Sequence, residues 1–187
     1  MVHYAPGMKW DESGWATGDV AALPVGEAWS LLAPEASAAI DGARWRHQAR
    51  TFFAARIELV HAKKYPDGAI PDLDAAEIDV AHANGNGAPT RVRIVTLPVA
   101  RALAVRASGE AGARAIGGAG FDVLVGRTRR VWQIATSRVS GDDARAPLVV
   151  AAVAASILLA PIVPPEGGAI FGGKGARVRL AAAGWRT

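Results

Sequence analysis

The longest uncharged run without glycine or proline extends from Leu148 to Ala160, and a proline flanks it at each end. As an α-helix its thirteen residues would rise only ~20 Å, whereas the hydrocarbon core of a bilayer is ~30 Å thick. We therefore expect a buried core element and no membrane span. Helix and strand both remain open for this run, because an apolar run has no period that separates them. Alanine and leucine favour a helix, and valine and isoleucine favour a strand.

Upstream of this run, the pattern predicts a helix at about 35–49 and then a strand that ends near residue 63. Pro34 and Glu35 are typical of a first helical turn, where proline is tolerated and an acid favours the positive end of the helix dipole. Beyond Thr51 the apolar positions fit helical and alternating spacing equally well, and we interpret them as the strand.

Two alternating segments, 75–83 and 91–97, lie on either side of Asn84-Gly85-Asn86-Gly87. Asn-Gly favours the positive backbone angles of a tight turn, so the pattern predicts a β-hairpin here. The chemistry of Tyr65-Pro66-Asp67-Gly68 also predicts a turn.

The other predicted elements are shorter. They are a helix at 99–116 that ends at Gly117–Gly120, strands at 121–125, 129–139 and 176–180, and a rigid turn at 164–168. Strands outnumber helices and the two kinds are interleaved. We therefore predict an α+β fold in a single domain, with a mixed or antiparallel sheet and a few alanine-rich helices.

Residues 1–33 have no regular pattern, since glycine and proline interrupt them repeatedly. Yet Trp10, Trp15 and Trp29 lie here, half of the six tryptophans in the chain. Aromatic rings are stabilised by burial and are scarce in disordered tails. We interpret 1–33 as an irregular N-terminal arm ahead of a domain at 34–187, and we assign these tryptophans to partner binding. The alternative is that the arm packs on its own domain, and we expect Trp185 to anchor the other end of the chain.

The composition is that of a folded globular protein, with 51% hydrophobic and 20% charged residues among 187. Cysteine is absent, which excludes disulfides and thiolate metal sites. The N-terminal residues lack a basic stretch followed by an apolar one, so we expect a cytoplasmic protein or one carried within an assembled particle.

The two halves of the chain differ in charge. Residues 1–89 carry seven Lys/Arg and twelve Asp/Glu, whereas residues 90–187 carry fourteen Lys/Arg and five Asp/Glu. Most of the cations in the second half are arginines. This asymmetry suggests either a nucleic-acid surface on the second half or head-to-tail packing of identical subunits. A solvated surface without a partner is the third interpretation.

Motifs that would indicate a nucleotide or metal site are incomplete. Gly168 to Lys174 has phosphate-loop spacing, but Gly175 replaces the Ser or Thr that would hold magnesium. Several acidic residues precede His82, but their spacing does not match a calcium-binding loop. Asp72, Asp74 and His82 remain as an alternative set of divalent-metal ligands. The histidines His3, His47, His61 and His82 lie in no nucleophile signature. We therefore expect no cofactor and no metal.

Arginines gather around Trp132 in the strand expected at 129–139. They are Arg127, Arg129, Arg130 and Arg138, and we assign them to a basic surface. Such a group could hold phosphates and stack a base, or its arginine stems could simply cover the ring.

The sequence as a whole favours a non-catalytic structural or assembly protein, acting in a homo-oligomer or larger particle such as a bacteriophage virion. Its partners would be further protein subunits. The alternatives are a nucleic-acid-binding protein that uses the arginine-rich half, and a small hydrolase or metal-dependent enzyme with a dispersed site.

Overall fold

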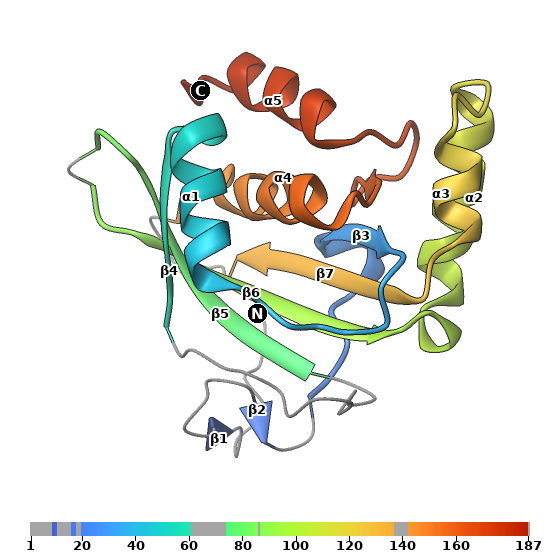
Figure 1. The fold of residues 1–187 in the computed structure, drawn as a ribbon, viewed down its shortest axis with the longest axis horizontal. Coiled ribbons are helices and arrows are strands. Elements are labelled where there is room, and N and C mark those ends of the chain that lie inside the picture. Colours follow the sequence, from blue (N-terminus) through green and yellow to red (C-terminus); the bar gives the residue numbers. More distant parts are fainter. Residues whose placement is uncertain are drawn as a thin grey trace.

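One six-stranded antiparallel sheet, in the order β4-β5-β6-β7-β3-β8, is the frame of the protein (Figure 1). The structure, a computed structural model, describes residues 9–10, 16–17, 20–60, 74–85, 87–136 and 142–186. The strands are β3 (Trp29–Ala33), β4 (Ala55–Leu59), β5 (Asp74–His82), β6 (Thr90–Pro98), β7 (Arg130–Thr136) and β8 (Ile162–Val163). Helices cover both faces of this sheet, so the α+β fold in a single domain is confirmed.

Three helices lie on one face: α1 (Gly42–Phe53), α4 (Ala146–Leu158) and α5 (Gly173–Ala182). α4 lies between the sheet and α5, with α1 beside it (Figure 1). A helix enclosed in this way is apolar on every side, which is why the sequence of α4 has no helical period. The expected core element is therefore confirmed, and it is a helix.

The helices α2 (Leu103–Ala115) and α3 (Phe121–Gly126) belong to a second core on the opposite face, near β3 and β8. A Cβ at Gly109 would lie 2.3 Å from Cδ1 of Leu32, and one at Gly112 would lie 2.5 Å from a carbonyl oxygen of a neighbouring loop. These glycines lower the helix propensity of α2, but Gly109 permits its close approach to the sheet and Gly112 its close approach to the loop at 168–170. Two short 3₁₀ helices, η1 (Val25–Glu27) and η2 (Val99–Arg101), are also present.

The first predicted helix was placed too early. Its true N-cap is Asp41, whose Oδ1 accepts hydrogen bonds from the amides of Ala43 and Arg44, both at 3.1 Å. The helix ends at Ala54, which adopts a left-handed conformation with φ of 44°. β4 follows at once and ends at Leu59, before the strand end predicted near residue 63.

Two predicted strands are helices instead. Residues 121–125 form most of α3, and residues 176–180 lie within α5. In α5 the buried residues are Ala176 and Leu180, four positions apart, whereas the three between them are exposed. That is the spacing of one helix face, which a short apolar segment does not distinguish from a strand.

The boundary of the N-terminal arm also changes, because residues 29–33 form β3 in the interior of the sheet, between β7 and β8. Trp29 packs edge-on against Phe171 of its own domain, with ring centroids 6.1 Å apart. Trp10 belongs to β1 (Lys9–Trp10), which pairs with β2 (Ala16–Thr17), and Trp15 lies outside the described residues.

The β5–β6 hairpin is confirmed, with Ile78 paired to Val92, and so is the strand now seen as β7. The turn after Pro164 is closed by a hydrogen bond of 3.0 Å from the amide of Gly167 to its carbonyl. The turn predicted at 65–68 lies outside the described residues. Among those that are described, no helix combines the length and apolarity needed to cross a bilayer.

Candidate functional site

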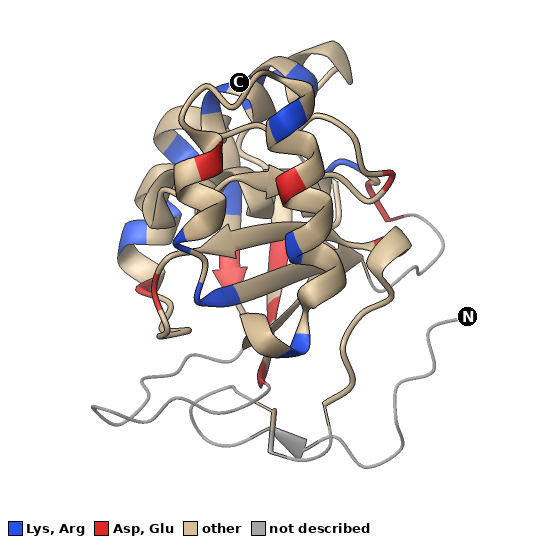
Figure 2. Cartoon of the chain, turned by 90° about the vertical axis from the view of Figure 1, so that its right-hand side faces the viewer, with Lys and Arg blue, Asp and Glu red and all other residues tan. Residues whose placement is uncertain are grey.

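Opposite charges from the two halves of the sequence meet within one chain. Arg91 on β6 bonds both carboxylate oxygens of Asp79 on β5, and its Nη1 lies 3.2 Å from Oε2 of Glu77. The hydrogen bond to Asp79 raises the pKa of Arg91. Viewed from the α2–α3 side, positive and negative residues are interspersed (Figure 2). In this view, therefore, the charge asymmetry between the two halves of the sequence does not produce a face of uniformly positive or negative charge.

A concentrated positive group lies where α1 runs beside β4. Its pocket has a volume of about 380 Å³ and is lined by Arg46, Arg50, Ala55, Arg56, Ile57, Glu58, Ala83 and Asn84. This volume is near the lower end of the range for small-ligand sites, roughly 300–1,000 Å³. We call it the arginine pocket. It contains three guanidinium groups and one carboxylate.

Local geometry explains why these side chains converge. Arg46 and Arg50 are four residues apart on α1 and therefore share one face, while Trp45, Ala49 and Phe53 face the core. Alternation along β4 exposes Arg56 and Glu58 and buries Ala55 and Ile57. The left-handed turn at Ala54 returns the chain along α1, so the helix and the strand lie side by side (Figure 1).

Within the described part of the chain, one of the three arginines has an ion-pair partner. Nη1 of Arg46 lies 3.4 Å from Oε2 of Glu58, and the two side chains are 50% and 60% exposed. The side chains of Arg50 and Arg56 make no hydrogen bond or ion pair with any residue that the structure describes. Among the residues that the structure describes, Arg50 and Arg56 thus have no side-chain partner, and both guanidinium groups line the pocket.

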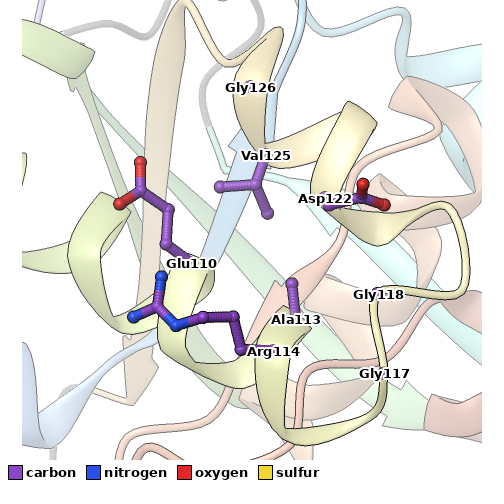
Figure 3. A pocket seen from close by; sticks show the side chains of 8 residues that line it. All are labelled: Glu110, Ala113, Arg114, Gly117, Gly118, Asp122, Val125 and Gly126. Carbon is purple, nitrogen blue, oxygen red and sulfur yellow. The ribbon is translucent and has the colours of Figure 1, made fainter.

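A second pocket, of about 420 Å³, lies between α2 and α3 (Figure 3). Glu110 and Arg114 project from α2, Asp122 lies on α3 near the turn at Gly118, and Ala113 and Val125 line the space between the two helices. Glu110 is paired with Arg106 on the same helix at 3.1 Å. The charges here largely balance, so this pocket selects neither anions nor cations as clearly as the arginine pocket does.

His82 lines a small cavity near the C-terminus, and both of its ring nitrogens make hydrogen bonds. The amide of Asn84 donates to Nδ1 of His82 at 3.3 Å, which leaves the ring proton on Nε2 to bond the carbonyl of Arg186 at 3.0 Å. Trp185 packs on the ring, with centroids 5.1 Å apart. With both ring nitrogens engaged, His82 holds the C-terminal tail in place and is not available as a base or a metal ligand.

The predicted basic surface is partly wrong. Arg130 is 1% exposed and donates to Oγ1 of Thr96 at 3.1 Å and to the carbonyl of Ala36 at 3.2 Å. Trp132 is completely buried and cannot stack a base. The face of β7 that carries Trp132 and Ile134 packs in the core with α4. Arg127 and Arg129 are exposed, and Arg138 lies outside the described residues.

The candidate metal ligands do not converge. Asp74 is buried and its Oδ1 accepts from the amide of Ala75 at 2.8 Å, while Asp72 lies outside the described residues. No group of three or more His, Asp or Glu that could hold a metal ion is found in the described part of the chain. Lys174, the last residue of the phosphate-loop spacing, is exposed in the first turn of α5.

No protein-family model, curated protein or solved structure matches this chain. Function therefore has to be argued from the arginine pocket itself. Sequence reasoning missed this site, although one signal was present: Arg46 and Arg50 have helical spacing within a half of the chain that is otherwise acidic.

Proposed function

We propose that the protein is a non-catalytic assembly protein that docks an acidic segment of a partner subunit in the arginine pocket. The observation that carries this proposal is a concave site with two guanidinium groups, those of Arg50 and Arg56, that have no side-chain partner among the described residues and lie beside a third arginine. Arginine forms planar, bidentate contacts with carboxylates, and unpaired guanidinium groups in a pocket favour an anionic partner.

The two alternatives from the sequence have less support. A nucleic-acid role relied on stacking by Trp132, which is buried, although Arg127 and Arg129 remain exposed. A catalytic role for the His82 cavity is not supported, since both ring nitrogens of that histidine are engaged.

The proposal is tested with a hexaglutamate peptide, titrated into the full chain by calorimetry at about 0.1 M and about 1 M salt. These salt concentrations correspond to screening lengths of ~10 Å and ~3 Å. We expect binding at the lower concentration, and its loss at the higher one and in the Arg50→Gln/Arg56→Gln variant. The matched control is Arg44→Gln/Arg101→Gln, which removes the same charge from two exposed residues outside the pocket.

Light scattering on the same proteins identifies the partner. A salt-sensitive mass above the 19.3 kDa of one chain would make the partner a second copy. A monomer that binds the peptide would make it a different subunit. Equal peptide binding by the pocket variant and its control would contradict the proposal. Tight oligonucleotide binding that depends on Arg127 and Arg129 would favour the nucleic-acid alternative instead.

A further inference from the structure

The net charge of the arginine pocket indicates which kind of anionic group the pocket binds. Three guanidinium groups and one carboxylate leave a charge of +2. Glu58 lies within bonding distance of Arg46, so the remaining charge belongs to Arg50 and Arg56. One arginine comes from the helix and the other from the strand, and both line the same cavity.

We propose that the group bound in this pocket is a dianionic phosphate, either a monoester or free phosphate, held by Arg50 and Arg56. This inference rests on the proposed function and names the chemistry of its acidic partner. A phosphate monoester carries a charge of about −1.5 to −2 near neutral pH and has three strong acceptor oxygens. It therefore balances the charges of both Arg50 and Arg56 at once, whereas a carboxylate balances only one. Asn84, on the rim of the pocket, adds a neutral side chain that is able to donate to a further oxygen.

Glu58 limits the affinity of this site. Its carboxylate lies within the pocket and already engages Arg46, so an entering phosphate meets a like charge and competes for that guanidinium. Removal of the Glu58 charge should free Arg46 as a third phosphate ligand. Because the Arg46–Glu58 pair is half exposed, the expected gain in phosphate affinity is modest, up to about fivefold.

The same chemistry has two sources, a phosphorylated side chain of a partner subunit and a free phosphate. Inorganic phosphate, O-phosphoserine and acetate are therefore titrated separately into the full chain at a pH of about 7.5, where a phosphate monoester, with its second pKa of ≈ 6, is mostly dianionic. We expect phosphate and O-phosphoserine to bind and acetate to bind at least tenfold more weakly. Tighter binding of O-phosphoserine than of inorganic phosphate would assign the site to a modified side chain, and the reverse order would assign it to free phosphate.

Variants locate the site. Arg50→Gln and Arg56→Gln should each weaken phosphate binding by about tenfold or more, because each removes a charge-assisted hydrogen-bonding partner. Glu58→Gln should strengthen it. Arg44→Gln is the matched control, since Arg44 lies exposed on the same helix and outside the pocket. Circular dichroism verifies that each variant is folded, and Arg50→Lys and Arg56→Lys replace any glutamine variant that is not.

Failure of this inference is separable from failure of the proposed function. Hexaglutamate and acetate binding without a preference for phosphate would overturn the phosphate assignment and leave the acidic partner in place. Absence of binding by every anion would overturn both. Equal losses in Arg44→Gln and Arg50→Gln would show a diffuse surface effect and would also overturn the site.

Discussion

Replacement of Trp185 tests how the C-terminal tail is held to the domain. This indole is 2% exposed, and its Nε1 donates a buried hydrogen bond of 2.7 Å to the carbonyl of Phe53 at the end of α1. The ring also contacts the His82 ring, and the guanidinium of Arg145 lies 5.3 Å from its centroid. One side chain thereby joins the tail to α1, the end of β5 and the segment before α4.

Trp185→Ala removes all of these contacts and leaves a cavity, so we expect a loss of about 3–5 kcal/mol in the free energy of unfolding. Trp185→Phe keeps most of the apolar contact but leaves the Phe53 carbonyl without its donor, which should cost about 1–3 kcal/mol. The stability of a whole domain is only about 5–15 kcal/mol, so either loss is readily measured.

The assay is urea unfolding followed by far-ultraviolet circular dichroism, because removal of a tryptophan alters the fluorescence signal itself. The control is the neighbouring substitution Arg186→Ala. The Arg186 side chain is exposed, and the variant keeps the main-chain carbonyl that bonds His82. The control should remain within about 0.5 kcal/mol of the parent. A Trp185→Ala variant within about 1 kcal/mol of the parent would refute the anchoring role.

Three further predictions concern stability. Val153→Asp should prevent soluble folding, measured as the soluble yield and a cooperative melt, because it places an unpaired charge at a completely buried position of α4. A normal melt would contradict the packing of that helix. Gly109→Ala should lower the free energy of unfolding in urea by about 1–3 kcal/mol, because its Cβ would overlap a buried leucine of β3. A Cβ at Gly126 would meet no atom within 4 Å, so Gly126→Ala should be nearly neutral. Equal effects of the two substitutions would contradict the close approach of α2 to the sheet. The hydrogen bond from Arg145 lowers the pKa of Asp143 below 3.8, so this pair stabilises the fold above that pH and the contribution is lost as the pH falls through the folded pKa. Asp143→Asn should therefore cost under about 1 kcal/mol at neutral pH, the pair being about one-third exposed, with the difference vanishing in acid unfolding curves; a pH-independent difference would contradict the ion pair.

The parts of the fold that local chemistry determines were predictable. The β5–β6 hairpin follows from alternation on both sides of an Asn-Gly turn. The core position of α4 follows from its uncharged sequence, but its helical form depends on the sheet and α5 enclosing it from two sides. Ala176 and Leu180 fitted a strand as well as a helix until the neighbouring α4 defined which positions are buried.

The candidate site was not predictable, because it depends on tertiary arrangement. Arg50 and Arg56 share a pocket only because Ala54 adopts a left-handed conformation and returns β4 along α1. Arg130 was assigned to a basic surface together with its neighbouring arginines, yet it is buried and donates to Thr96 and to a main-chain carbonyl in the interior. The partner-binding role predicted for Trp10 and Trp15 stays a prediction.

The most direct test of the central claim, that the arginine pocket binds an acidic partner, is a nuclear magnetic resonance titration of the arginine Nε–H groups with hexaglutamate. We predict that the signals of Arg50 and Arg56 shift and saturate together, with one dissociation constant. The signals of the exposed Arg44, Arg127 and Arg129 should stay in place. Parallel, unsaturable shifts of all exposed arginines, or saturation at Arg127 and Arg129 alone, would contradict the account.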